Sequence, residues 1–378
     1  MKLKYVWIAL LLVALLIGAF LLQFAFLEGV PSQDTPLSIF VGVDAAYDSL
    51  EEIKTLVDAI SPYTNLFVLG STGITYNTTK LDDACQYLYD KGLSFILFTE
   101  NPFQTQWLET AKNKWGDQFL GFYIFDEVGG RQLDVYRYRP VEHADNYTHA
   151  SNQFVTNITM HLNGVALSYP DSANFSSFTS DYALYWFDYK AGYDVVFAEF
   201  GWNYSRQLNV ALNRGAATVQ NKDWGVMITW TYTSLPYIES GAELYKDLVY
   251  AYDNGAKYIL IFDTNKNYTQ GILEGEHLEA LERFWQYIQD NPRTNADLSE
   301  RVAYVLPKDY GYGFRGPNDK IWGLWEADGL SFDISTNLGA MLNEHGTKLD
   351  IIYDDGLEPN NVYTYREFIF WNGTVINP

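Results

Sequence analysis

Cysteine is almost absent from this chain, which has 378 residues and a single cysteine, Cys85. No intramolecular disulfide can form, and a zinc site built from several cysteine ligands is excluded. Histidine is also scarce: its five copies are scattered, without the H-E-x-x-H or H-x-H spacing of a catalytic metal site. We therefore expect neither a metal ion nor any other cofactor, and a fold stabilised by its hydrophobic core.

Several catalytic motifs and much of the usual basic charge are missing as well. The sequence has no G-x-S-x-G nucleophile elbow, and no Walker or dinucleotide-binding loop. Lys and Arg number 25 against 47 Asp and Glu, which gives a formal net charge of −22. This balance argues against nucleic acid and anionic membrane surfaces as partners, and it suits a solvated extracellular surface.

The first 28 residues contain a long apolar run. Lys2 and Lys4 precede an uncharged stretch over 5–22, and the run resumes after Gln23. A membrane-spanning helix needs about 20 apolar residues, whereas a signal peptide has a shorter core and a small-residue cleavage site, which is not evident here. The pattern predicts a single-pass anchor over 1–28, a linker over 29–36, and an extracytoplasmic remainder. Cleavage of the segment would instead give a secreted protein.

Glycosylation sequons and aromatic residues are both plentiful. The sequons outnumber the roughly three that chance gives for this composition, and they begin at Asn77, Asn146, Asn157, Asn174, Asn203, Asn267 and Asn372. Aromatic residues make up 17% of the chain, with 11 Trp and 30 Tyr. The sequons favour an extracellular glycoprotein. The excess of Trp and Tyr favours carbohydrate binding, because their rings stack on the apolar faces of sugars.

Apolar strands alternate with amphipathic helical stretches between residues 37 and 292. We predict strands at 39–43, 66–69, 94–99, 119–125, 165–167, 195–200, 225–230 and 258–262. Helices are predicted between most of them, among others from Ser49 and over 176–191, but none is placed between the sixth and seventh strands. Eight units of this size are typical of a (β/α)8 TIM barrel. The alternative, a doubly wound open sheet, is disfavoured by the count of eight and by the missing phosphate loop.

A smaller α/β module is predicted over 299–378. It has strands at 302–306, 349–353 and 367–371, a helix at 331–344, and a glycine- and aromatic-rich loop over 310–330. Three strands are few for independent stability, so we expect this module to dock on the barrel.

Acidic residues follow several of the predicted barrel strands, where the active site of a TIM barrel lies. They are Asp44, Glu100, Asp126, Glu127, Asp171, Glu199 and Asp263. Glycoside hydrolysis needs two carboxyl groups that flank one bond. We predict that Glu127 or Asp126, paired with Glu199 across the barrel mouth, forms the catalytic set, because adjacent carboxylates raise one another's proton affinity. Gly129 and Gly130 permit a close approach directly afterwards.

The same rim supplies residues that could hold a sugar. The predicted substrate-binding residues are Asp44, Tyr47, Arg131, Trp202, Trp230, Tyr232 and Asp263. The aromatic members make a stacking floor. Arg131 could bind an acidic sugar or pair with the many carboxylates.

Residues 36–292 resemble the glycoside hydrolase (β/α)8 barrels, most directly in Gly121-Phe122-Tyr123-Ile124-Phe125-Asp126-Glu127, a fourth strand that ends in acid. The resemblance implies that Glu127 is the acid/base. The largest clan of these enzymes also ends its seventh strand in a nucleophilic Glu, whereas this chain has Thr229-Trp230-Thr231-Tyr232. Carboxylates after strands four and six are similar to the α-galactosidase-type clan, in which both are Asp.

The C-terminal module, with Val302-Ala303-Tyr304-Val305-Leu306-Pro307, resembles the flavodoxin-like domain of family 42 β-galactosidases. We therefore predict an extracytoplasmic, membrane-anchored glycoside hydrolase that acts on O-glycosidic bonds, with carbohydrate as its partner. The missing acid after strand seven motivates an alternative, a catalytically inactive glycan-binding or cell-surface structural protein on a glycosidase-like barrel. A barrel lyase or transglycosidase is the third hypothesis.

Overall fold

The computed structural model describes residues 39–100, 105–167, 175–293, 300–356 and 365–377. The predicted anchor over 1–28, the linker over 29–36 and Asp171 lie outside these ranges. Within them, no helix combines the length and apolar character that crossing a membrane requires. The described residues form one compact unit.

The first part of this unit is a closed barrel of eight parallel strands, in which β1 pairs with both β2 and β8. The strands are β1 (Phe40–Ala45), β2 (Leu66–Leu69), β3 (Ser94–Thr99), β4 (Phe119–Ile124), β5 (Ser176–Asp181), β6 (Val195–Phe200), β7 (Asp223–Ile228) and β8 (Tyr258–Asp263). The predicted barrel is confirmed, and the open doubly wound sheet is excluded.

Alternate residues of the strands fill the barrel interior. Phe178 on β5, Phe197 on β6 and Tyr258 on β8 have ring centroids 5.4–6.2 Å apart. Gly225 leaves room for one of these rings, because a Cβ atom there would lie 2.6 Å from Phe197 Cδ1. Successive side chains on a strand point to opposite faces, so the residues that continue this inward series toward the carboxyl ends of the strands face the mouth of the barrel.

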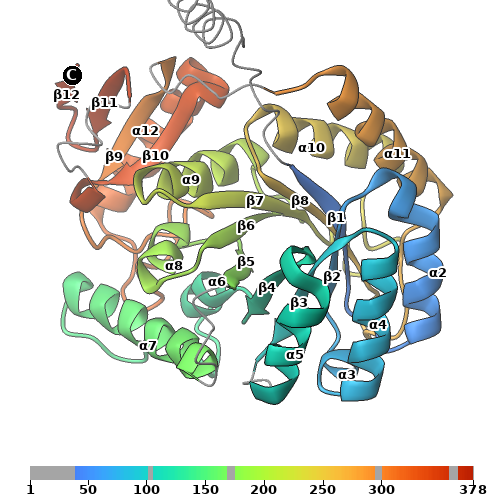
Figure 1. Cartoon of the computed structure of the whole chain (residues 1–378). Coiled ribbons are helices and arrows are strands. Elements are labelled where there is room, and N and C mark those ends of the chain that lie inside the picture. Colours follow the sequence, from blue (N-terminus) through green and yellow to red (C-terminus); the bar gives the residue numbers. More distant parts are fainter. Residues whose placement is uncertain (1–38, 101–104, 168–174, 294–299, 357–364, 378) are drawn as a thin grey trace, which may run out of the picture. The chain divides into compact units, whose positions relative to one another are not determined.

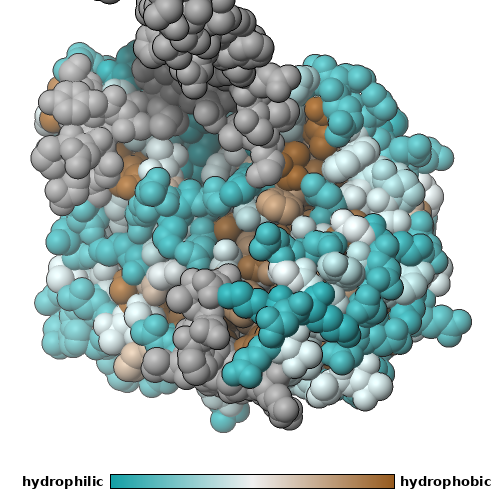
Figure 2. All heavy atoms as spheres, viewed as in Figure 1, coloured by the Kyte–Doolittle hydropathy of each residue, from teal (hydrophilic) through white to brown (hydrophobic). Residues whose placement is uncertain are grey.

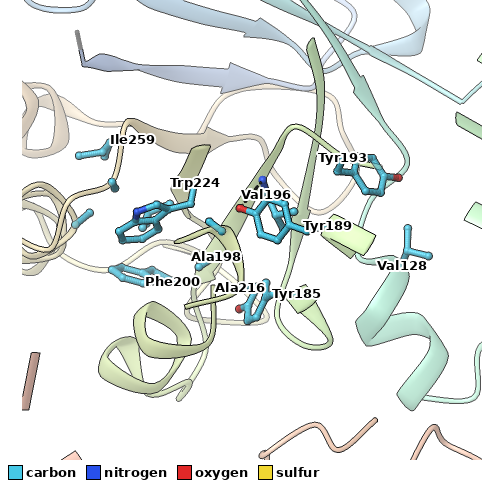
Figure 3. Close-up of a cluster of buried hydrophobic side chains, with 14 of the residues drawn as sticks. Val128, Tyr185, Tyr189, Tyr193, Val196, Ala198, Phe200, Ala216, Trp224 and Ile259 are labelled. Carbon is cyan, nitrogen blue, oxygen red and sulfur yellow. Dashed lines mark hydrogen bonds between the residues drawn. The ribbon is translucent and has the colours of Figure 1, made fainter. Parts of the chain in front are cut away.

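Helices cover the outside of the barrel (Figure 1). They are α2 (Leu50–Ile60), α3 (Thr72–Thr75), α4 (Thr78–Asp90), α5 (Thr105–Trp115), α6 (Val128–Leu133), α7 (Tyr147–Leu167), α8 (Tyr185–Ala191), α9 (Arg206–Val219), α10 (Gly241–Asp253) and α11 (Gly275–Asp290). Ser49 caps α2 as predicted, since its hydroxyl accepts a hydrogen bond from the Glu52 amide. Figure 3 shows side chains of α8 and α9, such as Tyr185 and Ala216, gathered with Phe200 and Trp224 of the strands.

The fifth strand was predicted in the wrong place. Residues 165–167 end helix α7, and the strand is Ser176–Asp181, which opens the stretch predicted as a helix over 176–191. Only Tyr185–Ala191 of that stretch is helical. The reason is composition: β5 reads Ser-Ser-Phe-Thr-Ser-Asp, so small hydroxyl and acidic side chains replace the apolar run that buried parallel strands usually carry. Helix α9 was also missed.

The second part of the unit is a small mixed sheet with one helix against it. Its strands are β9 (Val302–Leu306), β10 (Leu349–Tyr353), β11 (Glu367–Phe370) and β12 (Val375–Ile376), and the helix is α12 (Gly329–His345). The strand order is β10-β9-β11-β12, with β12 antiparallel to β11. The predicted α/β module is therefore present, with one additional short strand.

The module docks on the barrel, as expected, through α9 and β10, which lie side by side in Figure 1. Gly215 of α9 approaches so closely that a Cβ atom there would lie 2.5 Å from the Ile351 carbonyl oxygen. Next to it, Arg214 Nε and Asp350 Oδ1 are 2.7 Å apart, with side chains 3% and 0% exposed. The barrel and the module thus share one continuous core.

Candidate active site

A cavity of about 620 Å³ opens at the carboxyl ends of the barrel strands. We call it the main cavity. Its aromatic lining comes from Phe98, Tyr123, Trp202, Trp230, Phe262 and Tyr268. Hydrophilic residues cover much of the face seen in Figure 2, and hydrophobic residues show between them in several places.

Four polar side chains of the main cavity are placed by strand alternation. Glu199 follows the inward residues Val195 and Phe197 on β6, so its carboxyl group points into the top of the barrel. Ser180 follows Phe178 on β5 in the same way. Asp44 and Tyr123 reach the cavity from β1 and β4. A buried strand end therefore holds each of these groups in a fixed position.

A hydrogen-bond network joins Asp126 to Glu199. The Ser180 hydroxyl lies 2.7 Å from Glu199 Oε1 and 2.9 Å from Asp126 Oδ1. Tyr123 donates from its hydroxyl to Asp126 Oδ1 over 2.5 Å and also contacts Ser180 Oγ at 2.9 Å. Ser180 thus bridges two of the three predicted catalytic carboxyl groups.

Glu127 sits where the chain leaves β4 and enters α6. Its backbone is left-handed, with φ 53° and ψ 41°, and it occupies the N-cap position of α6. Its amide donates to the Ser180 carbonyl oxygen over 3.0 Å. Its side chain is in hydrogen-bonding contact with Glu199. The sequence-predicted pair Glu127 and Glu199 therefore comes together in the structure, with Asp126 beside it.

Burial and mutual repulsion raise the proton affinity of this pair. Burial, followed by the neighbouring charges of Asp126 and Asp181, raises the pKa of Glu127 to about 8. Burial and then Glu127 raise the pKa of Glu199 well above its ordinary value, while the hydrogen bond from Ser180 opposes this rise. Two contacting carboxyl groups in a desolvated site hold at least one proton between them at neutral pH. One member can then act as an acid and the other as a base or nucleophile.

Helix α6 is fixed from behind by Asp181, which faces away from the cavity. Asp181 Oδ2 accepts a hydrogen bond from the Gly129 amide at 2.5 Å, and Oδ1 accepts from Gly130 at 2.9 Å. Oδ1 also accepts from the amides of Tyr182 and Ala183. The predicted close approach at the two glycines is present, since a Cβ atom on Gly130 would meet the Tyr182 ring at 2.0 Å.

Arg131 of α6 is the cation of the main cavity lining. Its guanidinium lies 3.7 Å from Asp126 Oδ2 and 5.8 Å from the centre of the Tyr136 ring. Of the two roles left open for it, pairing with carboxylates is the one present. Arg131 also lines a second cavity of about 450 Å³. This side chamber shares Glu100, Asp126 and Arg131 with the main cavity and is otherwise lined by residues such as Phe125 and Ile158.

The predicted substrate-binding residues divide into two groups. Asp44, Arg131, Trp202 and Trp230 line the main cavity. Tyr47, Tyr232 and Asp263 are absent from its lining. Asp263 accepts hydrogen bonds from the Ile272 and Leu273 amides and from the Tyr47 hydroxyl at 3.3 Å.

Asp263 and Tyr47 thus form a pair that holds the loop before α11. The reason is alternation: the neighbouring Phe262 faces the cavity, so Asp263 faces the helices. Tyr232 is 45% exposed. Its position two residues after Trp230 carries it beyond the rim of the cavity.

Several residues of the site were missed from the sequence. Ser180 and Asp181 were assigned to a helix, so their places at and behind the barrel mouth could not be seen. Tyr123 was treated as an ordinary strand residue, and Tyr268 was not noticed because it lies in a loop after β8. The sequence did contain a sign of strand β5, because Phe178 and Ser180 alternate with Thr179 and Asp181, as residues on the two faces of a strand do. Within the described ranges, no cluster of His, Cys, Asp and Glu side chains has an arrangement that could hold a metal ion.

Comparisons with known proteins leave the family of this chain open. No family model and no curated protein matches the sequence. Among solved structures, the chain is similar to a β-glycosidase, with a TM-score of 0.43, 9% identity, and coverage of 70% of this chain and 99% of that one.

Two further solved structures are similar at comparable levels. A GH20 catalytic module of a pneumococcal exo-β-D-N-acetylglucosaminidase gives a TM-score of 0.43, 11% identity, and coverage of 70% and 86%. The 3-hexulose-6-phosphate synthase of Salmonella typhimurium gives 0.37, 6% identity, and coverage of 67% and 99%. All three TM-scores are 0.43 or lower, and all three identities are 11% or lower.

Proposed function

We propose that this protein is an extracytoplasmic glycoside hydrolase that cleaves O-glycosidic bonds with Glu127 as general acid and Glu199 as nucleophile. One observation carries the assignment: two carboxyl groups with raised pKa values contact each other inside a cavity lined by Trp and Tyr side chains. Hydrolysis of a glycoside requires such a pair, one member protonated and one ionised.

Burial raises the pKa of both carboxyl groups, that of Glu127 to about 8 and that of Glu199 well above its ordinary value, so the pair holds a proton at neutral pH. The division of roles follows from position along the barrel. Glu127 follows the fourth strand, where the glycoside hydrolase barrels that the sequence resembles carry their acid/base, so we assign to it the proton given to the leaving group. Glu199, held by Ser180, is then the member that attacks.

The spacing favours retention of anomeric configuration. Inverting enzymes keep their two carboxyl groups roughly 6.5–9.5 Å apart, to leave room for a water molecule. The bridge through Ser180 holds Asp126 and Glu199 closer than that, because its two bonds are 2.9 and 2.7 Å long. Glu127 and Glu199 are in direct contact. A bound glycoside would separate the latter pair as its glycosidic oxygen enters between them.

The reaction then proceeds in two steps. Glu127 gives its proton to the glycosidic oxygen while the bond to the leaving group breaks and a Glu199 oxygen bonds to the anomeric carbon. Glu127, now ionised, next takes a proton from a water molecule whose oxygen attacks the anomeric carbon, and the bond to Glu199 breaks. Trp202 and Trp230 supply faces on which a sugar ring can stack.

Hydrolysis by the purified full-length chain, assayed on a panel of aryl glycosides and polysaccharides, tests this function. We expect turnover with retained configuration, read from the first anomer by NMR. Glu127→Gln and Glu199→Gln should each lower kcat at least 100-fold. Glu239→Gln is the matched control, because Glu239 is also buried with a pKa raised to about 8 but lies outside both cavities. Full activity of Glu199→Gln would refute the assignment.

Azide separates the two roles. A small anion can occupy the space left by a truncated nucleophile and attack the anomeric carbon in its place. We expect azide to restore cleavage in Glu199→Ala with formation of a glycosyl azide. No such rescue is expected in Glu239→Ala.

The alternative is a glycan-binding protein without hydrolytic activity. Two observations favour it: the strand-seven end carries Thr229 in place of an acid, and the Glu127 and Glu199 side chains close upon each other. Binding of a glycan without turnover in the panel would establish this reading in place of the first.

The cellular setting is proposed from the sequence. The apolar run over 1–28 and the sequons support a membrane-anchored glycoprotein with the barrel outside the cytoplasm. Mass spectrometry of the mature N-terminus distinguishes this anchor from a cleaved signal. We also propose that the C-terminal module is a flavodoxin-like accessory domain.

A further inference from the structure

The lining of the main cavity is strongly unbalanced in charge. One side chain is a permanent cation, Arg131, and its guanidinium is directed at Asp126 over 3.7 Å. The lining contains six carboxyl groups, those of Asp44, Asp48, Glu100, Asp126, Glu127 and Glu199. A ligand that enters this cavity meets acceptors and negative charge on most sides.

Asp44 is the member of this set that has a free acceptor. Its side chain is 1% exposed and lines the cavity, and its Oδ1 atom has no hydrogen-bond partner in the protein. An unpaired buried polar atom is unfavourable by about 1–3 kcal/mol. The Oδ1 atom is therefore available to a donor that enters from the cavity.

The chain makes room for this carboxyl group with a glycine. A Cβ atom on Gly70 would lie 2.2 Å from Asp44 Oδ1. Nearby, Asp48 accepts a hydrogen bond from the Ser71 hydroxyl. We call Asp44, Asp48, Gly70 and Ser71 the Asp44 subsite. It belongs to β1, β2 and the loops after them, across the barrel from Glu199 on β6.

The charges that act on Asp44 come from Asp126 and Asp263, both acidic. Burial first, and then these two groups, raise the pKa of Asp44 well above its ordinary value. Lys80 reaches the subsite, but it donates to the backbone carbonyl oxygen of Asp48 and not to the Asp44 carboxyl group. The buried carboxyl group of Asp44 therefore has no cation of its own among the described residues.

We propose that the Asp44 subsite binds the protonated amino group of a basic sugar, so that the main cavity prefers amino sugars to neutral sugars and rejects uronic, sialic and sulfated ones. This rests on the proposed function, since it takes the ligand to be a carbohydrate. An ammonium group offers three donors and no acceptor, which complements a wall of carboxylates. A sugar carboxylate or sulfate offers no donor and adds like charge at low dielectric, where repulsion is strongest.

Binding of such a group is coupled to protons. An ammonium group beside Asp44 favours the ionised carboxylate, so binding lowers the pKa of Asp44 and releases protons at any pH where the free carboxyl group is partly protonated. A neutral sugar does not drive this ionisation. Proton release on binding is therefore a signature of the amino group at Asp44, and a purely structural role for Asp44 would not produce it.

The test is a glycan array that presents each of several backbones in amino, neutral and anionic forms, probed with the full-length chain. We expect the amino form of a recognised backbone to bind at least tenfold more tightly than its anionic form, with the neutral form between them. Preference for anionic forms would overturn the inference while leaving the proposed function in place. Absence of binding to every backbone would count against both.

Titration calorimetry of the best amino glycan in two buffers of different ionisation enthalpy then counts the released protons. Wild-type protein should release protons, and Asp44→Asn should release fewer and lose at least tenfold of the amino-over-neutral preference. Gly70→Ala should cause the same loss, because its methyl group displaces Asp44 Oδ1. Asp83→Asn, at an exposed aspartate paired with Lys54, is the matched control. An unchanged preference in both Asp44→Asn and Gly70→Ala would refute the subsite.

Discussion

Glu127 combines a left-handed backbone with a buried carboxyl group. Left-handed conformations disfavour residues other than glycine by about 1–2 kcal/mol, so a side chain persists there only where its surroundings hold it. Here the Glu127 amide bonds to Ser180, and the helix that follows is held by Asp181. The backbone turn at this residue directs its carboxyl group toward Glu199 and away from solvent.

The raised pKa of Glu127 makes the stability of the protein depend on pH. The folded-state pKa of about 8 lies above the ordinary value of 4.5. The folded protein therefore binds a proton that the unfolded chain has lost in this interval. The corresponding stabilisation is complete below about pH 4.5 and is lost as pH rises through 8, with a slope of at most about 1.4 kcal/mol per pH unit for one proton.

We expect Glu127→Gln to flatten this dependence. Urea unfolding followed at several pH values should show the wild-type free energy of unfolding falling more steeply between pH 5 and 8 than that of the variant. Glu51→Gln, on the first turn of α2, should keep the wild-type slope. Equal slopes in wild type and Glu127→Gln would contradict the raised pKa.

The same proton governs activity. If Glu127 is the general acid, only its protonated form can cleave the glycoside, so kcat should fall as pH rises past about 8. Removing Asp126, whose charge is the second cause of the raised pKa, should move this fall to lower pH in Asp126→Asn. A pH–rate profile of both proteins measures the shift. An alkaline limb at the same pH in both would show that another group controls it.

At the scale of the elements, α6 is the part that sets the geometry of the site. It has six residues, and it is too short to be stable by its own hydrogen bonds. Asp181 binds the amides of Gly129 and Gly130, while Gln132 binds the Val141 and Trp322 backbones. A helix fixed at both ends can hold Glu127 and Arg131 in place.

Asp181→Asn should disturb this arrangement without touching substrate. The side chain accepts hydrogen bonds at both oxygens, so an amide would place an N–H group against a donor amide. We expect kcat to fall at least tenfold, KM to stay within threefold, and the alkaline limb of the pH–rate profile to move as Glu127 shifts. Steady-state kinetics across pH measure all three.

Asp194→Asn provides the comparison for that experiment. Asp194 also accepts a bond from a backbone amide, that of Ser177 at 3.0 Å, but at the opposite end of β5. Its kinetics should match the wild type. If Asp181→Asn behaves like Asp194→Asn, Asp181 does not position the acid.

Periodicity predicted those elements whose side chains follow a simple rule. Seven barrel strands and three of the four strands of the C-terminal module have apolar runs, and each was found near its predicted place, whereas the two-residue β12 was not predicted. Strand β5 failed because its inward residues include Ser180, which serves the cavity and breaks the apolar pattern. The site was predictable to the same extent: Glu127 and Glu199 could be named from strand ends, whereas Ser180 and Asp181 depended on the missed strand.

At the scale of the whole molecule, the C-terminal module reaches the active-site helix. The loop between β9 and α12 carries Trp322, whose ring packs on Phe154 and Phe187 at 5.5 and 4.6 Å. In the same loop, Arg315 pairs with Asp134, the residue that ends α6. No rule of spacing in the sequence could have shown this, because the contacting residues are about 180 positions apart.

The buried ion pair between Arg214 of α9 and Asp350 of β10 should contribute much of the stability that couples the barrel to the module. Arg214→Ala would remove the closest partner of Asp350 and leave it Arg301 at 3.4 Å and the Tyr365 hydroxyl at 3.0 Å. We therefore expect destabilisation toward the lower end of the roughly 3–5 kcal/mol typical for breaking a buried pair. Lys54→Ala, at a surface pair with Asp83, should change stability by less than about 1 kcal/mol. Thermal and urea unfolding of both variants measure the difference. A single unfolding transition is expected in each, since barrel and module share a core.

Gly215 packs directly against the β10 backbone, and Arg214 pairs with Asp350 beside it. This contact surface determines what happens if the polypeptide is cut between the barrel and the module. A surface that belongs to both parts exposes apolar residues on each when either is made alone. A barrel chain ending at Arg293 and a separate chain starting at Glu300 should therefore be insoluble apart and reassemble when co-expressed. The covalent connection between them would then be dispensable, as in fragment complementation.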